Sequence, residues 1–349
     1  MIGLILASLF TFVELNCENL FDCRHDTLKD DVEFLPDGAY RWTRQRYWRK
    51  LDRIGQAIVG CGGSEEGWRL PSMVALCEVE NDTVMFDLTR RSFLRKANYK
   101  YIMTDSPDPR GIDVALMYSE FDFSPINHRT VRVELGPGVK PTRDLLYVSG
   151  LLSGGDTLHV VVAHFPSRRG GEAKSRPYRQ RAAEAVRALA DSVYAVSPSA
   201  NIIVAGDFNE YTGDANLSII AGSVYKDAAE SQTIQALPSP IDNRTLTINN
   251  FPSTINYPPS TLIDISEKAK GRNGAGGTYK YRGRWGSLDH IFASPALCGR
   301  LVDCYVFDAS FLLCEDKKYG GVQPRRNYLG PRYQNGFSDH LPLVARFVF

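Results

Sequence analysis

The sequence has no surplus of charge of either sign. Its 349 residues contain 41 Lys and Arg against 40 Asp and Glu, which leaves a formal net charge of +1. This balance excludes a strong overall attraction to nucleic acids or anionic membranes. Any attraction to a polyanion must therefore come from local groups of basic residues.

Cysteine is too sparse and too dispersed to form a framework. The seven cysteines include no Cys-x-x-Cys pair and stand at positions 17, 23, 61, 77, 298, 304 and 314. Their odd number argues against a closed set of disulfides, and their spacing argues against structural zinc. Cys77 lies inside the apolar run MVALCEV, where we expect a small buried hydrophobic side chain.

The sequence also has no apolar run long enough to cross a membrane. Residues 1–10, MIGLILASLF, are too few to span a bilayer and lack the Lys or Arg of a signal peptide. They are either the remnant of an export signal or a lead-in to the first strand. Localisation therefore stays open, with the cytoplasm as the default and export to the periplasm as the alternative.

Short apolar runs rich in β-branched residues recur along the chain and predict strands. They cover residues 10–15, 72–77, 112–118, 145–152, 158–165, 201–207, 288–294 and 341–349. Between them, apolar residues at helical spacing predict two helices with one buried face. The first set is Tyr47, Leu51, Ile54 and Ile58, and the second is Tyr178, Ala182, Val186, Leu189 and Val193.

No low-complexity linker or fixed-period repeat divides the chain, which predicts one α/β or α+β domain over residues 1–349. Residues 222–277 are rich in Ser, Thr, Asn, Pro and Gly and show little periodicity. We expect them to form a long surface excursion beside the core.

Polar residues stand at the ends of most of the predicted strands. They are Asn16, Glu78, Asp113, His164, Asp207, Asn209, Asp289, Asp339 and His340. Each one alone is explained as a turn cap or a solvated side chain. Their repetition predicts a convergent cluster of carboxylate and amide oxygens, which are the ligands that Mg²⁺ takes.

Seven blocks of the sequence resemble the signature blocks of the endonuclease/exonuclease/phosphatase superfamily. In chain order they are LNCENLF, LCEVEN, RGIDVALMY, AHFPSR, GDFNE, SLDHIF and SDHLPL. The resemblance implies a four-layer α/β sandwich, with two packed, mostly antiparallel sheets between outer helices. The active site would lie at one edge of the sheets.

The resemblance also implies a role for each residue of the cluster. Asn16 and Glu78 would hold Mg²⁺, or Mn²⁺ in its place, with Asp339 as a further contact. Asp207 would orient or deprotonate the attacking water. Asn209 would position both Asp207 and the phosphate. His340, oriented by Asp289, would stabilise charge on the phosphate.

Two histidines near this cluster have different expected roles. Residues alternate between the faces of a strand, so Asp289 and His290 point in opposite directions. The resemblance selects Asp289, and we expect His290 to be structural. It also implies that His164 contacts the scissile phosphate, and Asp113 is the acid that we expect to orient it.

Two locally basic stretches lie beside these residues and are candidates for phosphate binding. Residues 164–181 carry six Lys and Arg against one Glu, and residues 315–332 carry five against two acids. Arg168, Arg169 and residues 317–332 would contact phosphates that flank the scissile one.

The leading functional hypothesis is a Mg²⁺-dependent phosphodiesterase with nuclease-like action, working as a monomer. Its substrate would be a phosphodiester, and a nucleic acid is one such substrate. One alternative is a phosphatase that acts on a phosphorylated inositol, sugar or lipid headgroup. Another is a protein that binds a phosphate ligand without turning it over.

Overall fold

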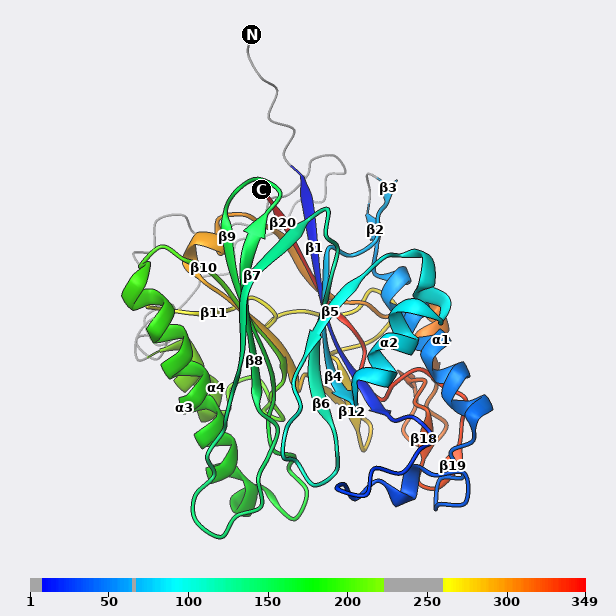
Figure 1. Cartoon of the computed structure of the whole chain (residues 1–349). Coiled ribbons are helices and arrows are strands. Elements are labelled where there is room, and N and C mark those ends of the chain that lie inside the picture. The colour runs from blue at the N-terminus through cyan, green and yellow to red at the C-terminus, as the bar shows by residue number, and fades with distance from the viewer. Residues whose placement is uncertain (1–7, 65–66, 223–259) are drawn as a thin grey trace.

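The computed structural model describes residues 8–64, 67–222 and 260–349, and it places two six-stranded sheets face to face (Figure 1). The first sheet consists, in spatial order, of β15 (Leu301–Val306), β20 (Leu343–Val348), β1 (Leu9–Leu20), β4 (Met73–Val79), β6 (Asp113–Tyr118) and β5 (Lys100–Met103). The second consists of β11 (Ile263–Asp264), β14 (Asp289–Ala293), β10 (Asn201–Asp207), β9 (Thr157–His164), β8 (Leu145–Leu152) and β7 (Phe123–Val131). Each sheet has one parallel pair, β1 with β4 and β9 with β10, and its other neighbours are antiparallel. The predicted pair of mostly antiparallel sheets is confirmed.

Helices cover the outer faces of both sheets and complete a four-layer sandwich (Figure 1). On the first sheet lie α1 (Arg44–Gly60) and α2 (Asp82–Arg90), and on the second lie α3 (Glu172–Val196) and α4 (Ala215–Ala221). The short α6 (Pro295–Cys298) connects β14 to β15. The predicted layer order is therefore confirmed.

Strand β10 shows why the central strands are apolar throughout. Ile203 and Ala205 face the core between the two sheets, whereas Ile202 and Val204 face a second core under α3 and α4. Alternate residues of a strand point to opposite faces, so a strand buried on both sides has no polar alternation. The same burial holds Asp207, at the end of β10, at a fixed position.

The two predicted helices are present, and they differ in how well the apolar spacing predicts their buried face. In α1, the side chain of Thr43 caps the first turn, and all four predicted residues are buried. In α3, Tyr178 is only half-buried and its neighbour Arg179 is fully buried. The guanidinium of Arg179 lies inside because Glu172 and Glu210 pair with it at 2.6 and 2.8 Å.

Short hairpins and 3₁₀ turns complete the fold. The hairpins are β2 (Gly63–Ser64) with β3 (Gly67–Trp68), β12 (Tyr279–Tyr281) with β13 (Arg284–Gly286), β16 (Leu313–Glu315) with β17 (Val322–Pro324), and β18 (Tyr328–Leu329) with β19 (Arg332–Tyr333). The 3₁₀ turns are Val32–Phe34, Phe93–Lys96 and Ser310–Leu312. The chain around β18 lies against the end of β1, because the backbone N–H groups of Asn327 and Tyr328 donate to Glu18.

The predicted surface excursion at residues 222–277 is wrong in its C-terminal part. Residues 223–259 lie outside the described residues. From residue 260 onward the chain joins the fold, because Ile263–Asp264 pairs with β14 and both Leu262 and Ile265 are buried. A strand of two residues is too short to show periodicity, so the sequence pattern does not reveal it.

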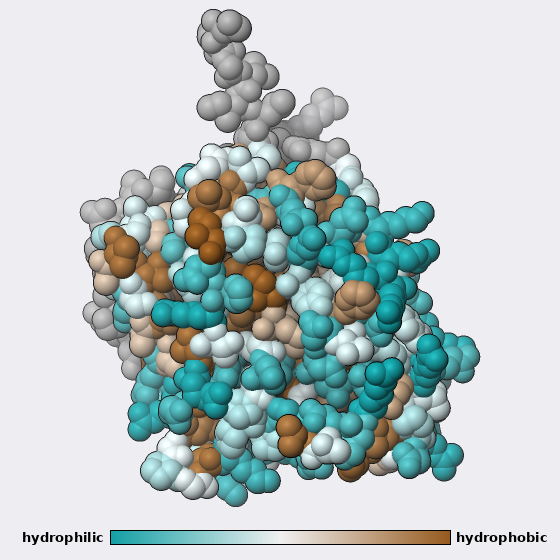
Figure 2. Space-filling model, viewed as in Figure 1, coloured by the Kyte–Doolittle hydropathy of each residue, from teal (hydrophilic) through white to brown (hydrophobic). Residues whose placement is uncertain are grey.

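The described part of the chain leads directly into the first strand. The surface of the molecule carries both hydrophilic and hydrophobic side chains. The N–H of Ser8 donates to the carbonyl of Phe349 (2.9 Å), and β1 starts at Leu9. Among the described helices, none combines the length and the apolar character that crossing a membrane requires. Figure 2 shows hydrophilic side chains over most of one face, with hydrophobic ones in separate small groups.

Candidate active site

Four polar side chains near the ends of the two parallel strand pairs meet between the sheets. Asn16 and Glu78 come from β1 and β4, and His164 and Asp207 come from β9 and β10. The amide of Asn16 donates to Oδ2 of Asp207 (2.9 Å). Nε2 of His164 lies 3.6 Å from the same oxygen and 3.8 Å from Oε1 of Glu78. Parallel strands end at the same edge of a sheet, and here the two parallel pairs face each other across the sandwich.

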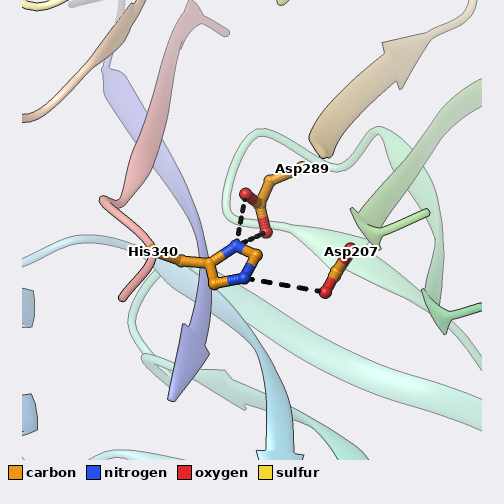
Figure 3. A group of neighbouring side chains, drawn as sticks. All are labelled: Asp207, Asp289 and His340. Atoms are coloured by element: carbon orange, nitrogen blue, oxygen red, sulfur yellow. Dashed lines mark hydrogen bonds and ion pairs between the residues drawn. The ribbon is translucent and has the colours of Figure 1, made fainter. Parts of the chain in front are cut away.

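His340 joins this group from the segment that leads into β20, and its two ring nitrogens face Asp289 and Asp207 (Figure 3). Nδ1 of His340 lies 2.7 and 3.0 Å from the two carboxylate oxygens of Asp289. The hydroxyl of Thr278 also donates to Asp289. The imidazole is thereby oriented with Nε2 toward Oδ2 of Asp207, at 4.0 Å. The predicted pairing of His340 with Asp289 is present in the structure.

The two histidines of the site have opposite pKa shifts. Burial would lower the pKa of His340, but the charge and hydrogen bond of Asp289 outweigh it and raise this pKa well above its usual value. Burial lowers the pKa of His164 well below its usual value, and the nearby Arg143 lowers it further. The surroundings therefore favour the imidazolium form at His340 and the neutral form at His164.

Asp207 is a buried acid with a pKa near neutrality. Burial raises its pKa to about 7, with His340 lowering it and Asp289 raising it. The backbone N–H of Asn209 donates to Oδ1 of Asp207 (2.8 Å), and the Asn209 amide donates to the carbonyl of Phe165 (3.2 Å). Asn209 thus fixes the orientation of the Asp207 carboxylate.

Side-chain oxygens that can bind a metal ion lie on the β1 and β4 side of the site. Oε2 of Glu78 accepts from the N–H of Asn19 (2.8 Å), and Oδ1 of Asn16 accepts from the N–H of Glu18 (2.9 Å). Asp339 is half-buried beside His340. Carboxylate and amide oxygens of this kind fit a hard divalent cation that keeps several water ligands. The residues present therefore suit the Mg²⁺ that the sequence predicts.

A second group of possible ligand atoms lies in Asp207, Asp289 and His340, whose donor atoms come within 4.8 Å of one another. We consider this group the weaker metal site on chemical grounds. Nδ1 of His340 is already paired with Asp289, and binding a metal through the imidazole would oppose the protonated form that Asp289 favours.

A buried ion pair fixes the end of β1 next to Asp339. The carboxylate of Glu18 accepts from the N–H groups of Asn327 (2.6 Å) and Tyr328 (3.0 Å). Nζ of the buried Lys50 lies 3.9 Å from Glu18. Burial and the charge of Asp339 raise the pKa of Glu18 to about 7. Glu18 therefore connects β1 to the segment that leads to Asp339 and His340.

The structure corrects the predicted partner of His164. Asp113 lies at the start of β6, and one of its oxygens accepts from the hydroxyls of Thr104 and Ser106 and from the N–H of Ser106. Nδ1 of His164 is buried and has no hydrogen-bond partner among the described residues. The prediction that Asp113 orients His164 is therefore wrong, because nearby hydroxyl groups occupy the carboxylate.

The two arginines predicted to bind phosphate differ in availability. The guanidinium of Arg168 pairs with Glu172 (2.5 Å) and Asp214 (2.8 Å) and lies over the ring of Tyr211. A substrate phosphate would have to displace carboxylates that already neutralise it. Arg169 is exposed. Burial raises the pKa of the nearby Tyr40 phenol, and the charge of Arg169 lowers that pKa. We therefore keep Arg169, and not Arg168, as the candidate for a substrate contact.

Three charged residues at the site are absent from the sequence predictions. Arg110 donates to the side chain of Asn19 (2.5 Å), and Arg143 donates to the carbonyl of Phe165 (2.5 Å). Both lower the pKa of His164. Glu14 lies two residues before Asn16 on the same strand face, fully buried, and its carboxyl oxygens have no partner among the described residues. Sequence signals for these residues exist: Arg110 and Arg143 are basic residues that each precede a strand, and Glu14 is a lone acid inside the apolar run FTFVEL.

Comparison with known proteins identifies the family. The model of the endonuclease/exonuclease/phosphatase family matches residues 11–252 and 265–348. The chain belongs to this family. No curated protein sequence matches the chain significantly.

Solved structures of this family share the fold at low sequence identity. An endonuclease/exonuclease/phosphatase family protein from Bacteroides thetaiotaomicron is 13% identical, with a TM-score of 0.57 over 98% of both chains. The mannosyl-6-phosphatase of the same species is 13% identical, with a TM-score of 0.56 over 97% of this chain and 100% of that one. Truncated TDP2 from Caenorhabditis elegans is 14% identical, with a TM-score of 0.52 over 98% of both chains.

Membership of the endonuclease/exonuclease/phosphatase family establishes the general chemistry. Members are hydrolases of phosphoester bonds and typically depend on a divalent metal. The clustered acids and histidines described above are the groups that such chemistry requires.

Proposed function

We propose that the chain hydrolyses a phosphodiester with the help of Mg²⁺. The observation that carries the proposal is the opposed arrangement of Asp207 and His340, 4.0 Å apart, with Asp289 behind the imidazole. This arrangement puts a water-activating group beside a hydrogen-bond donor, and a phosphate that reaches both would meet the attacking water and the donor together.

The residues of the chain divide the work as follows. Asp207 orients the attacking water and accepts its proton, and Asn209 holds Asp207 in place. The imidazolium of His340 donates to a phosphate oxygen as negative charge develops there. Glu78, Asn16 and Asp339 would hold the metal, which supplies charge neutralisation and helps the leaving oxygen depart.

A diester has two substituents, and two features next to the site would contact them. The ring of Tyr279 packs at 4.9 Å from that of His340. A hollow lies beside Asp339, and Tyr279 is not among its lining residues. A phosphomonoesterase is the second candidate, and the similarity in fold to the mannosyl-6-phosphatase favours it.

A substrate panel with a metal control tests the proposal. With Mg²⁺ or Mn²⁺, the protein should hydrolyse bis-p-nitrophenyl phosphate, and EDTA should abolish the reaction. Release of inorganic phosphate from monoesters, with diesters left intact, would favour the second candidate. No hydrolysis of either class would indicate a protein that only binds phosphate ligands.

Glu78→Gln tests the metal assignment without depending on turnover. The variant should lose metal-dependent activity, and it should also lose the rise in unfolding temperature that Mg²⁺ gives the unchanged protein, since a ligand stabilises the state that binds it. Glu80→Gln is the matched control, because Glu80 is a buried acid two residues away that contacts the N–H of Asp22. Retention of the Mg²⁺ shift in Glu78→Gln would contradict the assignment.

A further inference from the structure

A small hollow opens beside the metal-binding side of the active site. Its volume is about 170 Å³, and Asn19, Tyr40, Arg326 and Asp339 are among the residues that line it. Asn19 also donates its backbone N–H to Glu78 (2.8 Å), and Asp339 directly precedes His340. A group in the hollow would therefore sit next to a phosphate that contacts Asp207 and His340.

The size of the hollow limits its occupant. A cavity of about 150 Å³ holds one benzene ring, whereas pockets for drug-sized ligands begin at about 300 Å³. A hollow of about 170 Å³ thus has room for one six-membered ring. A nucleoside, with a base and a sugar, would extend beyond it.

The aromatic side chains at the hollow are largely occupied by one another. Phe34 lies stacked between Phe21 (4.2 Å) and Tyr40 (5.0 Å), and Tyr40 meets the edge of Tyr328 (4.8 Å). Phe34 is 6% exposed. The hollow therefore offers little open aromatic surface on which a flat base could stack.

Polar groups supply the remaining contacts. The carboxylate of Asp339 can accept hydrogen bonds, and the guanidinium of Arg326 can donate them. Nε of Arg326 is buried and has no hydrogen-bond partner within the described ranges. The side chain of Asn19 is held in place by Arg110 (2.5 Å). Donors and acceptors around a single-ring space match the hydroxyl groups of a sugar or cyclic polyol.

We propose that this hollow binds one hydroxylated six-membered ring attached to the phosphate that the active site attacks. The inference rests on the proposed function and narrows its substrate class to phosphate esters of a single sugar or cyclic polyol. It holds for a monoester and for a diester, because only one substituent enters the hollow.

Kinetics with matched substrates test the inference. With Mg²⁺, phosphate esters of hexoses and inositol, taken from the class (diester or monoester) that the protein hydrolyses in the substrate panel, should have a lower KM than the matching glycerol ester, which has no ring. Arg326→Met should raise the KM for the ring ester about tenfold and leave kcat within about twofold, as expected when a charged hydrogen bond to the bound ring is lost. The KM for the glycerol ester should not change. Arg95→Met, which alters an exposed arginine on the 3₁₀ turn Phe93–Lys96, is the control and should match the unchanged protein.

Direct binding separates a failure of this inference from a failure of the proposed function. Saturation-transfer NMR with free hexoses and inositol, without metal, should show binding to the unchanged protein and to Arg95→Met, and loss of binding in Arg326→Met. A thermal unfolding scan should show that Arg326→Met is folded. Absence of binding to the unchanged protein, equal KM values for ring and acyclic esters, or a preference for nucleotides would overturn the inference. Ring binding in a protein that hydrolyses no ester would refute the proposed function alone.

Discussion

Glu78 and Asn209 hold backbone angles that most residues avoid. Their φ angles are +60° and +50°, in the left-handed region. Such a conformation costs about 1–3 kcal/mol and persists only where surrounding contacts enforce it. At Asn209 it directs the backbone N–H to Asp207, and at Glu78 it coincides with an irregular step in the pairing of β4 with its neighbours. At both positions the strained residue lies at a strand end that shapes the site.

His340 is the residue whose loss should separate chemistry from folding most clearly. His340→Asn removes the imidazolium that faces Asp207, so kcat for bis-p-nitrophenyl phosphate should fall by about 10²–10³, the range found when one preorganised donor is removed. KM should change much less, because the donor acts mainly on the charge that develops during the reaction. Steady-state kinetics with Mg²⁺ measure both constants.

His159→Gln is the matched control for this variant. His159 is a half-buried histidine whose Nδ1 pairs with the hydroxyl of Tyr147 (2.8 Å), on the part of β9 remote from Asp207. Its replacement should leave kcat unchanged. Equal kcat values for His340→Asn and the unchanged protein would remove His340 from the mechanism.

At the residue scale, the sequence predicts side-chain direction better than side-chain partners. Alternation along the strand correctly separates Asp289, which meets His340, from His290, which contacts Asp264 and the carbonyl of Glu210. The partner of Asp113 is wrong because its hydroxyl partners come from the loop after β5, which a single strand pattern does not reveal. Glu14 is missed because a lone acid in a strand gives no sign of its burial.

At the element scale, β11 is attached to the second sheet partly through a buried ion pair. Oδ2 of Asp264 on β11 lies 2.8 Å from Nδ1 of His290 on β14. Burial would lower the pKa of His290, but Asp264 outweighs it, and the pKa is raised above the usual 6.5. The stabilisation that follows is fully present below about pH 6.5 and is lost as pH rises through the raised pKa of the folded state.

Asp264→Asn should therefore destabilise the protein in a pH-dependent way. The difference in free energy of unfolding from the unchanged protein should be largest near pH 6 and should shrink toward pH 9, because the neutral imidazole gains little from the carboxylate. Urea unfolding at several pH values measures it.

Asp303→Asn provides the comparison at the same scale. Nε of Arg346 on β20 donates to Oδ1 of Asp303 on β15 (2.7 Å). Arginine stays charged between pH 6 and pH 9. The cost of this variant should not vary between pH 6 and pH 9. A parallel pH dependence in both variants would show that His290 is not the titrating group.

Elements with a clear period were predictable, and those without one were not. The eight predicted strands and both long helices are present. The prediction omits β5, β7, β11 and β15 from the two large sheets, and near the start of α3 it expects Tyr178 on the buried face where Arg179 lies. A buried arginine depends on Glu172 and Glu210, and the second of these lies outside the helix.

At the scale of the whole molecule, the site depends on the pairing order of the strands. The spacing of apolar runs indicates strands but not their neighbours, so the sandwich itself was predicted only through the resemblance to a known family. The structure shows why the order matters: β1 contacts β4 in one sheet and faces β10 in the other, which brings Asn16 to Asp207 across 191 residues of chain.

The last strand should be essential to the whole sandwich. β20 lies between β15 and β1 and is hydrogen-bonded to both, and Leu343, Val344, Ala345 and Phe347 are fully buried. Deletion of residues 341–349 would divide the first sheet and free His340 from its support, so we expect loss of cooperative thermal unfolding together with activity. Two milder variants grade the effect: Leu343→Ala should cost about 2–5 kcal/mol of unfolding free energy, as for other buried leucines, whereas the more exposed Val348→Ala should cost much less. Circular dichroism melting curves measure all three, and a truncated protein that melts cooperatively at the temperature of the full chain would show that β20 is dispensable for the fold.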